Sequence, residues 1–369
     1  MSSISLCMIV KNEEDIISRC LNSIYDAVDE IIIVDTGSID KTKDIVSKYT
    51  KDIYDFEWRD NFSEARNFSF SKATKDYIMW LDADEFITKE NKNKLINLKE
   101  KINSNIDLIT LETHMCLDEN NNPKIIARRN RIVKRERNFQ WVGFLHEYIE
   151  VGCEGCNCYD SDISIIHDKV KCNDNRNLNI YKANISKGNK LSDRDLYYYG
   201  KELYYNRLWD EAIEVLDQFI RKDAWEEEII DALCKIGECY LHKCERIKAR
   251  EYFYKTFEYG APRGEILYNT AYSFELENKY DQAIKWYEII LGLELPSDCY
   301  QCVNLCCWRF KPHLNLCACY FEINEIQKSY YHHRKCLEIN PSNSCVLEND
   351  KVFKSLVKNK IIKPQDLGN

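Results

Sequence analysis

The sequence predicts an α/β domain with a mostly parallel sheet, followed by an all-α region built from helical repeats. In the first half, short β-branched runs alternate with amphipathic stretches, which is typical of strand–helix–strand units. From about residue 195 onward the strand signals stop and only helical periodicity continues. The length of 369 residues also favours two domains over one.

Four strands alternate with three helices in the part of the chain before residue 90. The runs "SISLCMIV" and "EIIIVD" are short and almost continuously apolar, as strands buried on both faces should be. Between them, "EEDIISRCLNSIYDAV" predicts a helix because its apolar residues fall on one face. Two more helices are expected in "DKTKDIVSKY" and "NFSEARNFSFSKA", and two more strands in "KDIYDFEW" and "DYIMWLDADEF".

Acidic side chains follow two of these strands. Asp35 ends the second run, and Asp82 and Asp84 end the fourth. Because α/β sheets bind ligands at the carboxyl ends of their strands, we expect these acids to converge on one edge. Strand alternation further predicts that Asp82 and Asp84 face one ligand. Neighbouring carboxylates repel each other unless a cation lies between them, which favours Mg²⁺ or Mn²⁺ bridging to phosphate oxygens.

Four stretches of the second half can be overlaid. Each has a small residue, a large apolar residue three positions on and another small residue twelve positions on. The copies begin at 200, 237, 271 and 317, so they are spaced by 37, 34 and 46 residues. The three sets are Gly200, Gly237, Ala271 and Cys317; Leu203, Tyr240, Phe274 and Tyr320; Ala212, Ala249, Ala283 and Ser329. This pattern resembles tetratricopeptide repeats, and Pro296 and Pro341 stand where such repeats end.

The stretches "SLCMIVKNEEDIISRCLNSI", "EIIIVDTGSIDKT" and "FSEARNFSFSKATKDYIMWLDADE" together resemble glycosyltransferase family 2. The resemblance covers roughly residues 4 to 88 and implies a GT-A fold that transfers a sugar from a nucleotide diphosphate with inversion. We therefore expect a catalytic domain at 1–175 and a linker with a connecting helix at 176–195. The tetratricopeptide repeats would then occupy 196–345, with a tail at 346–369.

The resemblance implies that one loop binds the nucleotide. Asp35 would hydrogen-bond the uracil or ribose edge, and Thr36, Gly37 and Ser38 would wrap the base. Gly37 would allow the backbone to approach the ligand closely. The same four residues are also compatible with an ordinary turn followed by a helix cap.

The resemblance also assigns residues from three other segments to the donor site. Asn12 and Glu13 would line the nucleotide pocket, although they could simply start a helix. Arg66 would face the base or the diphosphate, unless it is an exposed helix residue. Asp82 and Asp84 would form the metal–diphosphate site.

Two later motifs, "WVGFLHEYIEV" and "ISIIHDK", resemble family 2 members that are fused to tetratricopeptide repeats. Glu147 is then the candidate general base, and His167 would complete the metal site or touch the diphosphate. The alternatives are a surface strand acid for Glu147 and a structural histidine for His167, while His146 could position the loop. The region expected to supply the family's base shows no clear Glu-Asp pair, which "HE" could replace, and "HDKV" stands in place of the common "HxGY"-like ending.

Composition limits the classes of partner. The net charge of −9 argues against nucleic-acid binding and against an anionic membrane surface. No apolar run approaches the ~20 residues that cross a bilayer, and the N-terminus reads as a strand instead of a signal peptide. We therefore expect a cytoplasmic protein.

The chain has 18 cysteines, which mostly fall inside helical patterns. Free thiols used as small core residues are the favoured interpretation. Two clusters remain candidate metal sites. They are Cys153, Cys156, Cys158 and Cys172, and Cys299, Cys302, Cys306 and Cys307.

The leading hypothesis is an inverting, Mn²⁺- or Mg²⁺-dependent transferase that uses a nucleotide sugar, most simply a UDP-sugar. Its repeats would bind an acceptor polypeptide or a second copy of the chain. The domain pairing is similar to the sublancin-type peptide S-glycosyltransferases, and a cell-envelope transferase is the other acceptor class. A different class is a repeat-based scaffold with a vestigial catalytic domain.

Overall fold

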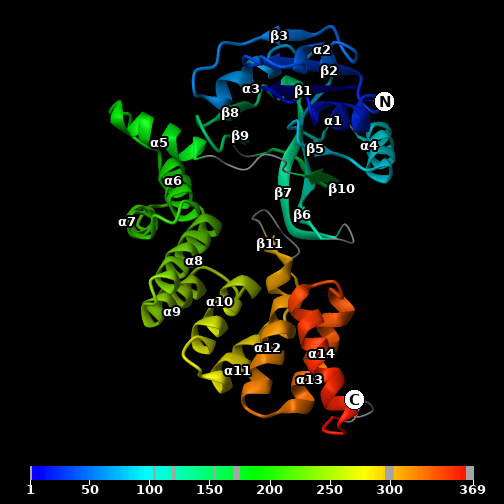
Figure 1. Cartoon of the computed structure of the whole chain (residues 1–369). Coiled ribbons are helices and arrows are strands. Elements are labelled where there is room, and N and C mark those ends of the chain that lie inside the picture. The colour runs from blue at the N-terminus through cyan, green and yellow to red at the C-terminus, as the bar shows by residue number, and fades with distance from the viewer. Residues whose placement is uncertain are drawn as a thin grey trace. The chain divides into compact units, whose positions relative to one another are not determined.

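The computed structural model describes residues 2–102, 105–118, 122–152, 155–168, 175–295 and 303–362. The chain divides into two compact units, made mainly of residues 1–180 and of residues 181–369. The first, called the α/β unit below, contains the sheet, and the second, the repeat unit, is helical (Figure 1). The predicted fold class is therefore confirmed.

The α/β unit is built on a sheet with the strand order β3-β2-β1-β4-β7-β6-β10-β5. Strand β1 pairs in parallel with β2 and β4, and β2 pairs in parallel with β3, so these four strands end on one edge. Strand β7 runs antiparallel between β4 and β6. The strands are β1 (Ile4–Val10), β2 (Glu30–Asp35), β3 (Ile53–Asp55), β4 (Tyr77–Trp80), β5 (Glu85–Phe86), β6 (Leu108–Leu117), β7 (Pro123–Lys134) and β10 (Cys158–His167).

Apolar side chains fill both faces of this sheet, as the continuous apolar runs predict. The larger core includes helix α1, whose Ile17, Cys20, Leu21 and Ile24 are fully buried. The smaller core gathers Trp80, Phe70 and Trp141. The helices are α1 (Ile17–Ile24), α2 (Thr42–Val46), α3 (Phe62–Phe70) and α4 (Lys89–Lys101), and a separate hairpin joins β8 (Gln140–Val142) to β9 (Tyr148–Glu150).

The repeat unit consists of successive helix pairs. Each pair turns at one residue in the left-handed conformation, namely Arg207, Cys244, Asn278 and Asn324. These four positions have the same spacing as the sequence repeat. The helices are α6 (Asp193–Tyr205), α7 (Trp209–Phe219), α8 (Glu226–His242), α9 (Arg246–Lys255), α10 (Gly264–Glu275), α11 (Tyr280–Leu291), α12 (Phe310–Glu322) and α13 (Ile326–Ile339), preceded by α5 (Arg176–Ser186).

Close helix approach explains the small residues of the repeat. A Cβ on Gly237 would lie 2.3 Å from Phe253 Cε1, and one on Gly200 would lie 2.5 Å from Leu216 Cδ2. Ala212 and Ala249 are completely buried at the facing positions. The tetratricopeptide-type packing inferred from the sequence is thus present.

A helix occupies much of the segment expected to be a tail. Helix α14 (Ser344–Lys358) follows Pro341, and the Asn343 side chain caps it by accepting from the Cys345 and Val346 amides. Phe353 packs on Cys317 and is 2% exposed, so the helix is docked on the last repeat. Its apolar face is narrow and its surface is charged, which is why the sequence pattern did not identify it.

Cysteines in the described residues all carry free thiols, and several, such as Cys20 and Cys239, are buried in the cores. Cys153, Cys172, Cys299 and Cys302 of the candidate clusters lie outside the described residues, as does Pro296. In the part of the chain that the structure describes, no helix combines the length and apolarity needed to span a membrane.

Candidate active site

The loops after β1 and β2 are joined at the edge where these strands end. Val10 and Asp35 are register partners, and Thr36 donates to the Val10 carbonyl through its amide at 2.9 Å and through Oγ1 at 3.2 Å. Asn12, which has φ = 55°, donates its amide to Ser38 Oγ at 2.9 Å. Asn12 and Ser38, both predicted to line the nucleotide pocket, are therefore brought together.

One carboxylate oxygen of Asp35 stabilises the turn after β2, and the other forms no hydrogen bond among the described residues. Its Oδ1 accepts from the amides of Gly37 at 2.9 Å and Ser38 at 2.8 Å. Its Oδ2 is buried and has no hydrogen-bond partner among the described residues. A buried acceptor without a donor is costly, so this atom marks a place where a ligand donor would be stabilising. Gly37 has φ = 104°, and open space surrounds its Cα, so this position favours glycine.

Asn12 and Glu13 also brace the neighbouring loop. The Asn12 Oδ1 accepts from the Ile39 amide at 2.8 Å, and the Glu13 amide donates to Thr42 Oγ1 at 2.7 Å. These contacts hold the first turn of α2 against the end of β1. The two residues thus lie at the predicted edge, and they have a structural role there.

Arg66 of α3 joins two acids that are distant in sequence. Its Nη2 donates to Asp82 Oδ1 at 2.8 Å, and its Nε donates to Glu147 Oε1 at 2.6 Å. The Arg66 side chain is 7% exposed, which contradicts the alternative of an exposed helix residue. Burial alone would lower the pKa of Arg66, but the charges of Asp82 and Glu147 outweigh this effect and raise it. Arg66 is therefore a fixed cation at the centre of the acidic edge.

Two tryptophans hold the Arg66 guanidinium in place, and sequence reasoning missed both. The guanidinium carbon lies 4.7 Å from the ring centres of Trp80 and of Trp141. Asn67, the next residue of α3, accepts from the Trp141 amide at 2.8 Å and donates to its carbonyl at 2.9 Å. This pair of bonds brings the β8–β9 hairpin, and with it Glu147, to Arg66. Trp141, the first residue of "WVGFLHE", was the available signal.

Asp82 and Asp84 point to different partners. Strand β4 ends at Trp80, so both acids lie in a turn, and the alternation expected of a strand does not set their directions. Asp82 bonds to Arg66, whereas Asp84 Oδ2 lies 3.1 Å from His167 Nε2. Burial raises the pKa of Asp82, but Arg66 outweighs it and lowers the pKa overall, so Asp82 stays ionised.

The separation of Asp84 and His167 is compatible with a shared metal ion. The hydrogen bond to Asp84 raises the pKa of His167, and both side chains are 27% exposed. Ligand atoms about 2.1 Å from an octahedral ion, at right angles to each other, lie about 3 Å apart, close to the observed 3.1 Å. No set of three His, Cys, Asp or Glu side chains within the described ranges is arranged to hold a metal. The residues present thus fit an ion that keeps several water or phosphate ligands, as Mg²⁺ and Mn²⁺ do.

His146 and Glu147 lie in the turn between β8 and β9. His146 has φ = 50°, a strained conformation for this residue, and the nearby Phe144 carbonyl accepts from the Phe62 amide at 2.9 Å. The Glu147 side chain is 11% exposed, which contradicts the alternative of a surface strand acid.

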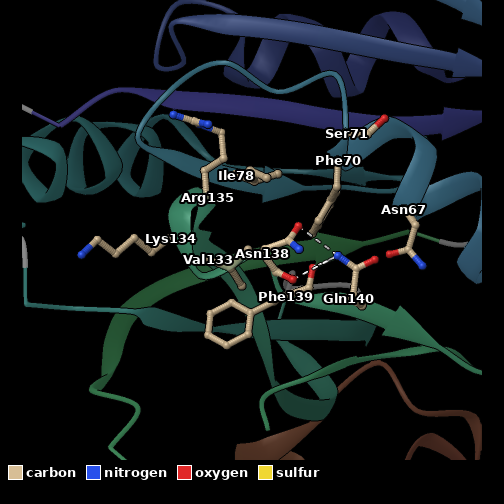
Figure 2. Close-up of a pocket in the computed structure, with 10 residues that line it drawn as sticks. All are labelled: Asn67, Phe70, Ser71, Ile78, Val133, Lys134, Arg135, Asn138, Phe139 and Gln140. Carbon is tan, nitrogen blue, oxygen red and sulfur yellow. Dashed lines mark hydrogen bonds between the residues drawn. The ribbon is translucent and has the colours of Figure 1, made fainter.

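A cavity of about 330 Å³ lies away from these residues (Figure 2). It is near the start of β4, where Ile78 pairs with Val133, whereas the acids follow the end of β4. The Gln140 side chain folds back on its own loop, where its Nε2 donates to the Asn138 carbonyl at 3.0 Å. None of the predicted site residues lines it; the lining is Asn67, Phe70, Ser71, Ile78, Val133, Lys134, Arg135, Asn138, Phe139 and Gln140.

Comparison with known proteins supports both units. Residues 5–153 match the family described as Glycosyl transferase family 2. The SPbeta prophage-derived glycosyltransferase SunS of Bacillus subtilis is 27% identical over 252 residues, covering 63% of this chain and 57% of the relative. A TPR repeat-containing protein of Synechococcus elongatus is 46% identical over 90 residues, covering 24% of this chain and 22% of the relative. The chain thus spans less than two thirds of each relative's length.

Solved structures show a weaker likeness. Glucosyl-3-phosphoglycerate synthase from Mycobacterium tuberculosis, in complex with Mn²⁺ and UDP-glucose, has a TM-score of 0.36 at 14% identity. That match covers 52% of this chain and 81% of the other, and it is too low to support an argument about function. The family match and the repeat geometry are independent of it. Residues 5–153 thus match glycosyltransferase family 2, and the helical unit that follows has the packing of tetratricopeptide repeats.

Proposed function

We propose that the protein is an inverting, metal-dependent glycosyltransferase that moves a sugar from a UDP-sugar to a peptide or protein acceptor. The observation that carries the proposal is the chain of ion pairs Asp82–Arg66–Glu147, which lies beside the Asp84–His167 pair at the carboxyl edge of the sheet. A vestigial domain would not need this chain of charges for its stability, because apolar residues of similar volume often replace buried ion pairs at no cost.

The nucleotide would bind where β1 and β2 end. The free Oδ2 of Asp35 suits an N–H or O–H donor, such as the uracil N3–H or a ribose hydroxyl. Thr36, Gly37 and Ser38 would surround the base, with Asn12 and Glu13 bracing them. Arg66 would attract the diphosphate electrostatically from its buried position.

Asp84 and His167 would hold Mn²⁺ or Mg²⁺, and Asp82 would contribute from the same turn. A bound divalent ion would neutralise the charge that develops on the departing diphosphate. Binding would displace the proton that Asp84 and His167 share, because a metal-bound imidazole must be neutral.

Glu147 is the proposed general base. Its Oε1 is held by Arg66, so the other oxygen, Oε2, would take the proton from the acceptor hydroxyl or thiol. The acceptor atom forms a bond to the anomeric carbon as the bond from that carbon to the diphosphate oxygen breaks. The electron pair leaves with the diphosphate, and the configuration inverts in one step without a covalent enzyme intermediate.

The repeats would recognise the acceptor. Repeat arrays of this type present extended surfaces to peptides, so the acceptor would be a peptide whose thiol or hydroxyl is modified. A cell-envelope glycan acceptor and a scaffold without catalysis are the competing outcomes of the test below.

Incubating the purified chain with a panel of UDP-sugars and Mn²⁺ tests the proposal, with hydrolysis and acceptor transfer read by mass spectrometry. We expect UDP with Mn²⁺ to raise the Tm, since a ligand that binds only the folded state stabilises it. EDTA should remove that increase. The absence of both the increase and any turnover would support the scaffold and overturn the proposal.

A further inference from the structure

A buried ion pair lies directly beneath the acidic turn. Arg131 of β7 donates to both carboxylate oxygens of Glu85, from Nη1 at 2.8 Å and from Nη2 at 2.5 Å. The two side chains are 0% and 3% exposed. Nη2 also donates to Thr113 Oγ1 at 3.0 Å. Glu85 therefore cannot act as a general base, since neither of its oxygens is open to an acceptor.

Glu85 also closes the turn that contains Asp82. The Asp82 amide donates to Glu85 Oε2 at 3.0 Å, and the Glu85 amide donates to the Asp82 carbonyl at 3.1 Å. These two bonds fix the backbone on both sides of Asp84. Glu85 thus helps to set the direction of Asp84, together with the Asp168 amide, which donates to the Asp84 carbonyl at 3.1 Å, and the pairing of β5 with β10.

Arg131 is fixed in turn by its aromatic neighbour. Its guanidinium carbon lies 3.8 Å from the ring centre of Trp80, whose ring also contacts Arg66. Stability alone does not explain the pair, because apolar residues of similar volume often replace a buried ion pair at no cost. A side chain that fixes the direction of a turn must form directed hydrogen bonds, as Glu85 does to Arg131 and to the Asp82 amide. Apolar side chains cannot form such bonds.

We infer that Arg131 and Glu85 are positioning residues that aim Asp82 and Asp84 at the metal and the diphosphate. The inference rests on the proposed function for its ligand, but the effect on the turn is a property of the protein without ligand. Arg131 acts through Glu85 and touches neither the donor nor the acceptor.

The test replaces the pair as a unit, Glu85→Leu with Arg131→Met, so that no buried charge is left alone. The control is Glu112→Leu with Arg128→Met, which removes another Arg–Glu pair between β6 and β7, joined at 3.0 Å and more exposed, at 13% for Arg128 and 35% for Glu112. We expect both double variants to fold with a similar Tm. Only the first should bind UDP with Mn²⁺ at least tenfold more weakly by calorimetry, with a matching loss in donor hydrolysis.

Amide exchange of the ligand-free protein provides a readout that does not depend on the proposed function. The Asp82 amide should exchange at least tenfold faster in the first double variant than in the control. If wild-type protein fails to bind UDP but this amide loses protection, the donor assignment is wrong and the positioning role stands. Unchanged exchange, or unchanged affinity in a protein that does bind UDP, would overturn the inference.

Arg131→Lys covers the case in which the double variant does not fold. A lysine keeps the charge but cannot hold both oxygens of Glu85 in a fixed fork. We expect an intermediate loss of affinity for UDP with Mn²⁺, while affinity for UDP in EDTA stays near the wild-type value. An equal loss with and without the metal would show a general structural defect and contradict the positioning role.

Discussion

The two units assemble their important contacts over very different sequence distances. In the repeat unit, Gly200 packs on Leu216 within one helix pair, and the next helix pair repeats this contact between Gly237 and Phe253. The contacts are therefore local and recur. In the α/β unit, Arg66 and Glu147 are 81 residues apart, and Asp84 and His167 are 83 apart. The repeat packing is therefore encoded in local spacing, whereas the candidate site exists only once the whole sheet has formed.

Two acids, one in each unit, differ in the partners of their carboxylate oxygens. In the repeats, Asp231 accepts from the Tyr197 hydroxyl at 2.6 Å and pairs with Lys201 at 2.8 Å. Its charge is therefore neutralised by a group of the same unit. At the edge of the sheet, Asp35 Oδ2 has no partner among the described residues. The contrast concerns these two acids: Asp231 is paired within the protein, whereas one oxygen of Asp35 is available to a ligand donor.

The largest expected effect is at Asp84. Asp84→Ala removes one of the two groups placed to bind the ion, so transfer should fall by about 10³-fold or more. The Mn²⁺-dependent gain in UDP affinity should disappear in calorimetry, and Asp82→Ala should leave some of it. Asp168→Asn is the matched control, because this acid pairs with Arg19 at the surface and is 55% exposed. Full activity of Asp84→Ala in EDTA would contradict a metal-dependent reaction.

The next effect is at Glu147. Glu147→Gln preserves size and hydrogen bonding to Arg66 but cannot accept a proton, so turnover should fall by about 10²–10⁴-fold while donor affinity persists. Steady-state rates and UDP titration on the same preparation separate the two quantities. Glu150→Gln on the exposed side of β9 should change neither. Normal turnover in Glu147→Gln would place the base on another residue.

The sequence predicted the parts of the site that follow local patterns. Asp35 and Asp82 stand after apolar runs, and the position of each acid could be read from the end of its strand. The pairing of Glu85 with Arg131 could not be predicted, because the partners are 46 residues apart and an arginine in a strand usually faces water. The directions in which the Asp82 and Asp84 side chains point could not be predicted either, because these residues lie in a turn and not in a strand.

A smaller effect is expected from filling the repeat contact. Gly237→Ala places a Cβ 2.3 Å from the buried ring of Phe253, and overpacking of this kind costs about 1–3 kcal/mol. The gain in helix propensity, about 0.5–1 kcal/mol, offsets part of that cost. Gly292→Ala is the control, because its nearest neighbour, the Ile289 carbonyl, is 3.5 Å away. Denaturant unfolding measures the difference, and a more stable Gly237→Ala would show that Phe253 can move aside.

The smallest effect concerns acid sensitivity of the last repeat. The Nδ1 atoms of His313 and His332 lie 2.8 Å apart, so one must donate and the other accept. Burial lowers the pKa of both, that of His313 to about 4, and the nearby Lys335 and Arg309 oppose protonation of His313 further, while Glu338 favours it. Tyr320 and Tyr331 complete the surroundings of His332.

The sign of the pH effect follows from these depressed values. The unfolded chain takes up protons near pH 6.5, whereas the folded pair resists them until about pH 4. The stabilisation is therefore complete above pH 6.5 and is lost as the pH falls from there toward 4, on the order of 3 kcal/mol for His313 alone. His313→Gln with His332→Gln should remove most of this slope, because two amides can hydrogen-bond without titrating. His242→Gln, at a histidine that stacks on Trp209, serves as the control. Urea unfolding at pH 7, 5.5 and 4.5 measures the slope, and an unchanged slope in the double variant would assign the acid sensitivity to other titratable groups.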